Sequence, residues 1–444
     1  AAAAAMVLSG GDLGTTAKRI GTINVGSATA NGALTTLDGD EIFADNFNII
    51  GGDHAAEDSV VISIENITAT DGIVLTAASL GDAELNFTTT ASTVAGTVDS
   101  GSGTDGTGLT LIDADVAATF ANNVGATTAI EKMEVAAIVV DLNGATNAIE
   151  SVVVTGAGTL SFDAAADQTF EGVITFAADD DGTIINANTD GELTITGVIG
   201  TASIAATEIT LADGANTNFN SAIFALTLDI NTNGETTVFE VAGNEIGDTG
   251  GNGGALEIVA GAVIELGTAI GSGDTVFDTS TALENGSGVV IAGDFTIKPS
   301  ANFTSGTIVL IQGDSAEVSS TEKADILLQD TALTDFTVDD GGGTATHDIG
   351  ITATAKSDET TASELSVTTN NAKSLRQAIE SANTGSSSDS AALTALNDSL
   401  VVINGRSATD DTDLAKQVAP QDDMISGSTF ATKAMTGSLQ GIMS

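Results

Sequence analysis

The chain contains 444 residues, carries a formal net charge of −50 at pH 7 and has no Cys, Trp or Tyr. Such an acidic surface repels nucleic acid and anionic membranes, so no nucleic-acid partner is expected, and it attracts cations. No run of 18 apolar residues is present, so no transmembrane helix is expected.

The charge is distributed unevenly along the chain. Residues 20–290 contain 39 acidic residues and one base, Lys132, whereas residues 291–444 contain 21 acids and 8 bases. The lack of Cys does not assign a compartment. It fits export of an unfolded chain through a narrow pore, because a disulfide would hold a loop too wide to pass.

Residues 1–21 are expected to form an irregular N-terminal segment. The opening residues AAAAAM are what cleavage at an Ala-rich signal-peptide site would leave, and they fit a placeholder for unread residues equally well.

From Thr22 to about Ala355 the chain consists of short apolar runs separated by Gly, Asn, Asp and Ser. Strict alternation over four or five positions is typical of a half-buried strand, and the residues between the runs are typical of turns. Strands are predicted at 22–25, 47–50, 60–64, 72–78, 83–90, 109–113, 152–162, 172–178, 182–187, 191–199, 225–230, 254–258, 263–266, 293–297 and 306–310. Residues 91–108 are predicted to form one long loop, and 117–135 a loop with a strand.

This texture predicts an all-β fold, a right-handed parallel β-solenoid over residues 22–320. The Gly-x-apolar-x-apolar units recur without a fixed period, which favours irregular coils with variable loops. Residues 1–298 contain no Pro, as expected for a backbone engaged in strand pairing. A β junction that caps the last coil is predicted at 321–370. Residues 371–444 have helical spacing, with helices expected at 374–383 and 389–402.

One stretch fits a calcium-binding loop. Asp229, Asn231, Asn233 and Glu240, with a turn at Gly234, follow the pattern D-x-N-x-N-G-x5-E, and carboxylate and amide oxygens suit calcium. The flanking segments are predicted strands rather than helices, so an Asn-Gly turn between two strands is the competing interpretation. No other cofactor is predicted.

The other short motifs are weaker evidence for a binding or catalytic site. Gly101, Gly103 and Gly106 fit G-x-G-x-x-G, but a predicted strand follows where a dinucleotide site needs a helix. The acidic turn at 179–181 would bind a cation or simply be solvated. The two histidines, His54 and His347, have no nucleophile motif beside them, so no catalytic residue is predicted.

The C-terminal quarter resembles a known family. The runs at 324–336, 351–356 and 363–370, the helical 389–396 and the segment 414–443, with Ala-Pro-Gln at 419–421, follow the order found at the end of the passenger region of bacterial autotransporters. The resemblance implies a solenoid with coils of about 20–25 residues. It also implies a junction that templates folding, and a helical linker that enters an outer-membrane barrel of the same precursor.

The barrel does not lie within these residues. The resemblance therefore implies either cleavage near Ser444 or a barrel outside this sequence. It places the protein outside the cell, at the outer-membrane surface of a Gram-negative bacterium.

The expected function is that of a non-enzymatic passenger that forms a surface coat, filament or adhesive stalk and associates with itself. Loops such as 91–108 and 241–253 would contact partners. The alternatives are a polysaccharide-active β-helix enzyme and a cation-dependent binding module. An enzyme of this kind usually stacks sugars on aromatic rings and uses bases on the array, and the sequence has few of either.

Overall fold

A computed structural model describes most of the chain up to Glu364. The described residues are 6–26, 35–51, 58–77, 81–88, 90–101, 108–136, 138–247, 255–279, 288–300, 303–313, 323–331, 333–339 and 348–364, together with Thr369 and Lys373.

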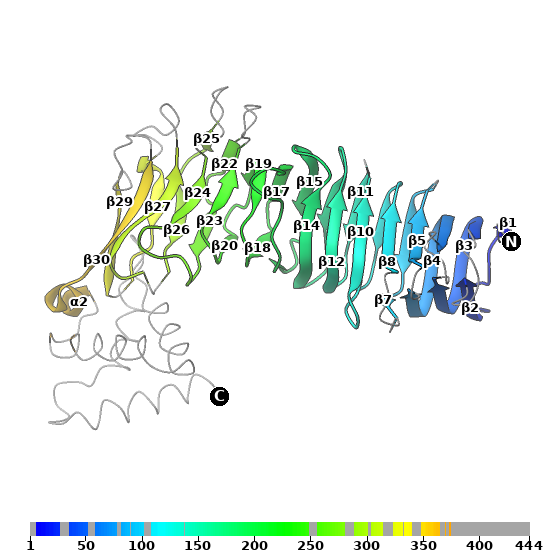
Figure 1. The fold of residues 1–444 in the computed structure, drawn as a ribbon. Helices are drawn as coiled ribbons and strands as arrows, with labels where there is room; N and C mark the ends of the chain where they lie inside the picture. The colour runs from blue at the N-terminus through cyan, green and yellow to red at the C-terminus, as the bar shows by residue number, and fades with distance from the viewer. Residues whose placement is uncertain are drawn as a thin grey trace, which may run out of the picture. The chain divides into compact units, whose positions relative to one another are not determined.

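Short strands account for most of the described residues (Figure 1). They are β1 (Met6–Ser9), β2 (Ile20–Gly26), β3 (Thr35–Ile50), β4 (Asp58–Thr76), β5 (Ala83–Phe87), β6 (Ser92–Ala95), β7 (Val98–Ser100), β8 (Thr110–Ala114), β9 (Ala118–Phe120), β10 (Ile130–Val135), β11 (Val139–Leu142), β12 (Thr146–Val154), β13 (Thr159–Phe162), β14 (Gln168–Phe176), β15 (Asp181–Asn186), β16 (Glu192–Ile195), β17 (Ala206–Leu211), β18 (Asn216–Phe219), β19 (Phe224–Ile230), β20 (Thr236–Phe239), β21 (Asn244–Ile246), β22 (Ala255–Ile258), β23 (Val263–Leu266), β24 (Thr275–Asp278), β25 (Val289–Ile291), β26 (Phe295–Lys298), β27 (Gly306–Gln312), β28 (Ile326–Leu328), β29 (Thr334–Asp339) and β30 (Ile349–Ala355). The helix α2 (Asp358–Glu364) follows.

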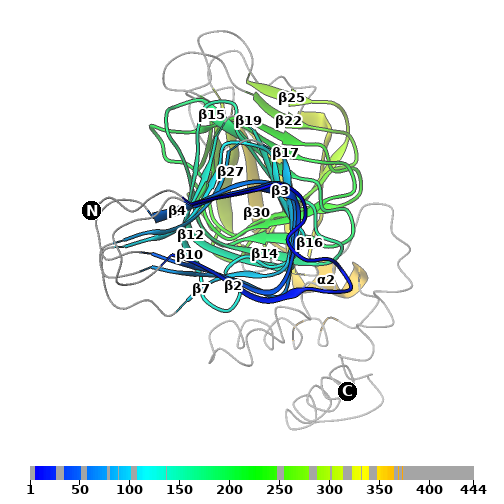
Figure 2. The same ribbon diagram turned by 90° about the vertical axis from the view of Figure 1, so that its right-hand side faces the viewer.

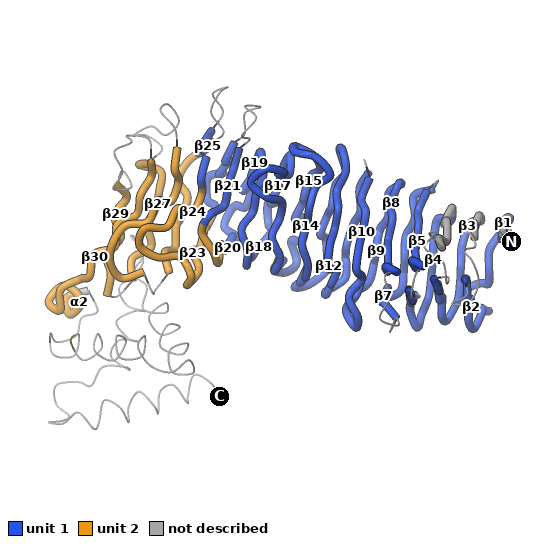
Figure 3. The backbone as a smooth tube through the Cα atoms, in the orientation of Figure 1, with its two compact units in different colours: residues 1–239, 243–262, 278–292 blue, residues 240–242, 263–277, 293–444 orange. Residues whose placement is uncertain are grey.

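The chain divides into two compact units (Figure 3). Unit 1 comprises residues 1–239, 243–262 and 278–292, and unit 2 comprises residues 240–242, 263–277 and 293–444.

Unit 1 is a stack of coils in which strands pair in parallel with their counterparts one coil later. Three strand ladders result, which we call faces 1, 2 and 3. Face 1 contains β5, β8, β10 and the second halves of β12 and β14. Face 2 contains β6, β9, β11, β13, β15, β17, β19, β22 and β25. Face 3 contains the first halves of β12 and β14, with β16, β18 and β20.

The coils of unit 1 superimpose around one interior (Figure 2). Their length varies: Ile130 pairs with Ile149 in a short coil, whereas Leu256 pairs with Val289 across a much longer one. The predicted parallel β-solenoid is therefore confirmed, and the variable coil length explains why the sequence shows no fixed repeat. The right-handed turn of the coils stays a prediction.

Alternation of side chains builds the core of unit 1. Inward positions of each strand are buried and mostly apolar, as in the pattern of β8, where Thr110, Ile112 and Ala114 are buried and the residues between them are not. Aromatic rings pack edge to face within a coil, as Phe162 and Phe170 do, and also contact one another between coils. Phe219 and Phe239, in register on face 3, have ring centroids 5.3 Å apart with an interplanar angle of 21°.

Glycine is required where face 3 turns into face 1. Gly172 has φ of 135°, and a Cβ atom there would lie 1.6 Å from the carbonyl oxygen of Ile149 in the preceding coil. Gly197 occupies the equivalent place one coil later, where a Cβ atom would lie 1.7 Å from the carbonyl oxygen of Gly172. The corner is thus too tight for any side chain.

Acidic side chains at the corners bond to the backbone of the next coil. Asp82 Oδ1 accepts the Leu109 N–H at 2.7 Å, and Asp167 Oδ1 accepts the Glu192 N–H at 3.1 Å. These carboxylates satisfy backbone donors at corners where the ladders are interrupted. Part of the acidic composition therefore serves the fold.

Unit 2 combines parallel and antiparallel pairing. β23, β26 and β28 pair in parallel, whereas β30 pairs antiparallel with both β27 and β29. β30 thus lies between β27 and β29 and runs in the opposite direction to both. The antiparallel strands β29 and β30 lie within the stretch 321–370, where a β junction is expected, and the capping and folding roles of that stretch stay predictions.

Three local expectations need correction or limits. The predicted loop at 91–108 contains β6 and β7, in which Val94 and Val98 are buried. The prediction was wrong because these two valines are isolated among Gly, Ser and Thr, which are typical of turns. The stretch 1–21, expected to be irregular, contains β1, which pairs in parallel with β3. The helices expected at 374–383 and 389–402 lie outside the described residues.

Candidate functional site

The strongest electrostatic feature of unit 1 is a row of polar side chains on the outer side of face 1. Asn86 on β5 is in register with Asp113 on β8, and Asp113 is in register with Glu134 on β10. Adjacent strands lie about 4.8 Å apart, so these side chains are direct neighbours. We call Glu84, Asn86, Asp113, Lys132 and Glu134 the face 1 cluster.

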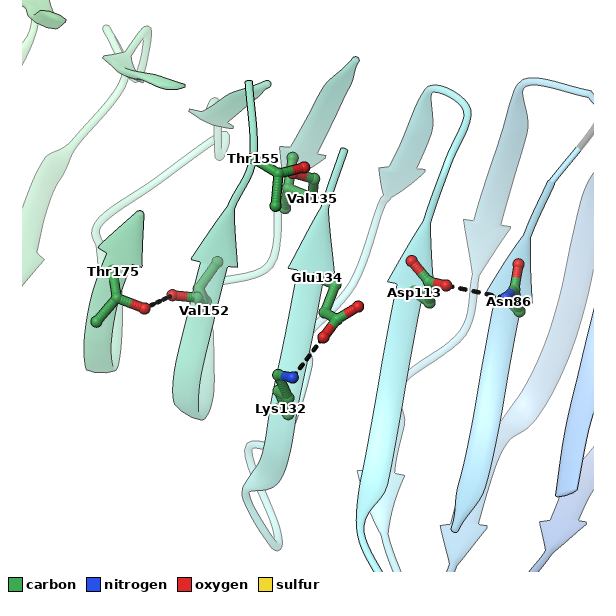
Figure 4. A network of polar contacts seen from close by, with 8 residues as sticks. All are labelled: Asn86, Asp113, Lys132, Glu134, Val135, Val152, Thr155 and Thr175. Atoms are coloured by element: carbon green, nitrogen blue, oxygen red, sulfur yellow. Dashed lines mark hydrogen bonds and ion pairs between the residues drawn. The ribbon is translucent and has the colours of Figure 1, made fainter. Parts of the chain in front are cut away.

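The cluster contains two sets of polar contacts, and Figure 4 shows the Asn86–Asp113 hydrogen bond and the Lys132–Glu134 ion pair. The Asn86 amide group donates from Nδ2 to Glu84 Oε1 at 2.8 Å and to Asp113 Oδ2 at 3.0 Å. Glu84 is buried at 5% exposure. One amide group therefore bridges two carboxylates. On the neighbouring strand, Lys132 Nζ forms an ion pair with Glu134 Oε1.

Asp113 holds its proton more tightly than an ordinary aspartate. Burial, followed by the charges of Asp115, Glu84 and Glu134, raises the pKa of Asp113 to about 6, while Lys132 acts in the opposite direction. The carboxyl group consequently changes its charge between about pH 5 and 7. Lys132 is the only base between residues 20 and 290, so no second cation of that stretch relieves this row.

A second carboxylate group lies on the outer side of face 2. Asp229 on β19 is in register with Glu257 on β22. Burial, then the charges of Glu257 and Glu208, raises the pKa of Asp229. Face 2 therefore repeats, one coil to the next, the crowding of negative charge found on face 1.

A third set of carboxylates consists of Glu245 on β21 and the nearby Asp179 and Asp278. Burial, then the charges of Asp278 and Asp179, raises the pKa of Glu245. A cavity of about 10 Å³ is lined by Asp179, Glu245, Thr201, Ala202, Ala205, Phe224 and Gly247. That volume suits one water molecule, and a sugar ring does not fit it.

The residues of the predicted calcium loop do not all point the same way. Asp229 is at the outer side of face 2, and Asn231 and Asn233 are exposed in the turn between β19 and β20. Glu240 follows β20 and belongs to unit 2. Strands flank the turn on both sides, as the competing interpretation expected. Calcium binding by Asp229, Asn231, Asn233 and Glu240 stays a prediction.

Among the described residues, no three His, Cys, Asp or Glu side chains group closely enough to hold a metal ion. The outer carboxylates of unit 1 are instead spread along rows. Each carboxylate in such a row lies near others of the same charge, which favours its protonated form.

The acidic turn at 179–181 has a structural use. Asp179 Oδ1 accepts the Ala205 N–H at 3.0 Å, and Asp181 Oδ2 accepts the Ala178 N–H at 3.0 Å. His54, His347, Gly103 and Gly106 lie outside the described residues.

Sequence inspection missed the face 1 cluster. Glu84, Asp113 and Glu134 belong to three successive coils, and no local motif links them. Only the register of successive coils brings them together. The signal that would have found them is the pairing of strands with similar acid–apolar alternation, once the coil length is known.

In the parts of the chain that the structure covers, no helix has the length and apolarity needed to cross a membrane. No protein-family model, curated protein or solved structure matches this chain. The resemblance to autotransporter passengers therefore remains a hypothesis that rests on the residues quoted for it.

Proposed function

We propose that the chain is the passenger region of an autotransporter-type protein and acts outside the cell as a non-enzymatic structural component of a surface coat, filament or adhesive stalk. The observation that carries the proposal is the succession of parallel coils followed by antiparallel strands. This order agrees with the resemblance of the C-terminal quarter. The lack of Cys is consistent with export of an unfolded chain.

Association between copies would be controlled by charge. Unit 1 presents carboxylates on the outer sides of faces 1 and 2, and neighbouring acids contribute to the raised pKa of Asp113 and of Asp229. Two such surfaces repel each other at neutral pH and low salt. Salt screening, protonation or divalent cations bridging carboxylates would lower that repulsion.

Electron microscopy of the purified protein, with and without calcium, tests the structural role. We expect ordered assemblies, favoured by calcium or salt. Isolated particles under every condition would remove the coat and filament roles and leave adhesion. Turnover of a panel of polysaccharides would replace the proposal with an enzymatic one.

Cell fractionation tests the export route. We expect the passenger at the surface or in the medium, made from a precursor with a C-terminal barrel. A precursor gene without barrel-coding sequence would contradict the autotransporter assignment.

Cation-dependent binding is the second candidate. The raised pKa values of Asp113, Asp229 and Glu245 favour it, because the same crowding of negative charge that retains protons also attracts metal cations. Isothermal titration of calcium would show saturable uptake under this candidate.

A further inference from the structure

The inner side of one corner of unit 1 is polar. Where face 2 turns into face 3, successive coils carry polar side chains that are at most 1% exposed. They are Gln168, Asn186, Asn188, Thr217, Thr232 and Thr237. Elsewhere the interior rows of the same strands are mainly Ile, Leu and Phe. Polar residues at such depth require hydrogen-bond partners.

The earlier coils of this corner supply many of those partners themselves. Asn186 Nδ2 donates to Thr217 Oγ1 at 2.7 Å and to the carbonyl oxygen of Asn216 at 3.1 Å. Asn188 Nδ2 donates to the carbonyl oxygen of Ala166 at 2.8 Å. These two side chains are therefore tied into the coils on either side.

Within the part of the chain that the structure covers, an earlier coil leaves one buried oxygen of this corner, Gln168 Oε1, without a partner, and the last of these coils leaves three. Thr232 Oγ1, Glu235 Oε2 and Thr237 Oγ1 are buried atoms with no hydrogen-bond partner among the described residues. Thr232 and Glu235 lie in the turn that joins β19 to β20, and Thr237 lies at the start of β20. A buried hydroxyl without a partner costs about 1–3 kcal/mol, and a carboxylate oxygen costs more.

We propose that this turn binds an ordered internal water molecule, held by Thr232, Glu235 and Thr237. Buried water typically makes about three hydrogen bonds to polar groups that otherwise lack partners. Water can donate to Glu235 Oε2 while it accepts from one threonine hydroxyl and donates to the other. A single molecule thus satisfies all three oxygens.

The register of the coils supports a bridge to the preceding coil. Thr217 and Thr237 are paired positions on β18 and β20, and both side chains are buried. Paired strands lie about 4.8 Å apart. Two hydrogen bonds of about 2.8 Å that meet at a tetrahedral water span about 4.6 Å. Threonine hydroxyls that follow this strand spacing can share one water molecule between them.

Ala215 is fully buried and precedes Thr217 by two residues, just as Glu235 precedes Thr237. If the pairing of Thr217 with Thr237 continues two residues toward the turn, the small methyl group of Ala215 lies opposite Glu235 and leaves space beside it. A cation is the less suitable occupant, because one carboxylate and two hydroxyls are a weak ligand set compared with the six to eight oxygens that calcium takes.

Isosteric substitution in the full chain tests the proposal. Thr237→Val and Thr232→Val remove one hydroxyl each and keep the side-chain shape. If the hydroxyls bind water, each variant should lower the thermal midpoint relative to Thr183→Val, a matched substitution at the outer side of β15. Thr237→Ser should retain most of the native midpoint. A midpoint of Thr237→Val equal to or above that of Thr183→Val would overturn the proposal.

Relaxation dispersion of water oxygen-17 provides the direct readout. The native chain should show more long-lived internal water than the double variant Thr232→Val/Thr237→Val, and Thr183→Val should match the native chain. Equal water signals in all three would overturn the proposal. A midpoint that rises with calcium in the native chain but not in Glu235→Gln would replace water with a cation, and would also overturn it.

Discussion

Units 1 and 2 differ in which charged side chains have a partner of opposite charge. In unit 1, carboxylates face carboxylates along the outer rows, and Lys132 is the one base that pairs with an acid among its described residues. In unit 2, Lys298 lies 3.8 Å from Glu265 and the buried Lys356 lies 3.3 Å from Asp335. Two lysines of unit 2 thus have an acidic partner, whereas the outer carboxylates of faces 1 and 2 in unit 1 lie beside other acids.

Strand pairing accounts for the stacking of acids in unit 1, but not for the ion pair between Lys298 and Glu265, whose residues are in register on the parallel strands β26 and β23. Parallel, in-register coils stack equivalent positions over one another, so an acid tolerated in one coil acquires an acid as its neighbour in the next, as with Asp113 and Glu134. Like charges directly opposite each other destabilise a sheet. In unit 2, β30 reverses direction and places its residues against unrelated positions of β27 and β29. We infer that pH and salt act mainly on unit 1.

The largest expected effect on stability comes from removing a buried ring between the coils of unit 1. Phe219→Ala should cost about 3–5 kcal/mol of unfolding free energy, because it removes a fully buried ring and its contact with Phe239. Denaturant unfolding would measure it, with Phe219→Leu as the milder control. A loss below about 1 kcal/mol would mean that the coils do not share a packed core.

A second substitution breaks the antiparallel pairing of unit 2. Ile351 pairs with Ile308 on β27 and with Val338 on β29. Ile351→Pro should destabilise this pairing by about 3 kcal/mol, because proline removes a backbone donor. Hydrogen exchange should speed up in β27, β29 and β30, whereas Ile351→Val should behave like the native chain. Unchanged exchange in these strands would contradict the pairing of β30 with both neighbours.

Substitutions of a corner carboxylate can separate the contribution of its charge to stability from that of its hydrogen bond. Asp167→Ala removes the acceptor of the Glu192 N–H and should cost about 1 kcal/mol. Asp167→Asn keeps an acceptor and removes a charge, so its thermal midpoint should equal or exceed that of the native chain. If both variants lose the same stability, the carboxylate acts through its charge instead.

The smallest expected effect comes from removing the charge of Asp113, which is disfavoured first by burial and then by the neighbouring acids of face 1. The folded chain raises the pKa of Asp113 from 3.8 to about 6, so the folded state binds its proton more tightly than the unfolded state. This group therefore favours folding below about pH 4, and that contribution is lost as the pH rises through about 6. In thermal unfolding, Asp113→Asn should raise the midpoint at pH 7.5 but leave it unchanged at pH 3.5.

Glu150→Gln is the matched control for Asp113→Asn, since Glu150 is exposed in β12. It should change the midpoint less than Asp113→Asn at pH 7.5. An equal gain from both variants would attribute the effect to net charge rather than to the face 1 cluster.

The fold could be predicted from local alternation because each strand buries about one side chain in two. The run at 225–230 shows this, since Leu228 and Ile230 are fully buried while Asp229 between them is not. The stretch 91–108 was wrongly predicted to be a loop because its inward residues, Val94 and Val98, are isolated among turn-forming residues.

The candidate site could not be predicted in the same way. Asp113 and Glu134 become neighbours only through coil register, and that register depends on coil lengths that vary along the chain. The calcium loop illustrates the converse. A local motif identified Asp229, Asn231 and Glu240, but the fold buries Thr232 and Thr237, which lie between Asn231 and Glu240. A motif does not show which side of a strand its residues occupy.

Sedimentation velocity of the full chain tests most directly the claim that charge on unit 1 holds copies apart. At pH 7.5 and low salt we expect monomers, because the outer carboxylates are ionised and unscreened. At pH 5.5, or with added salt or calcium, we expect larger species, and Asp113→Asn should associate at a higher pH than the native chain. Sedimentation as monomers under all of these conditions, with no effect of Asp113→Asn, would contradict the account.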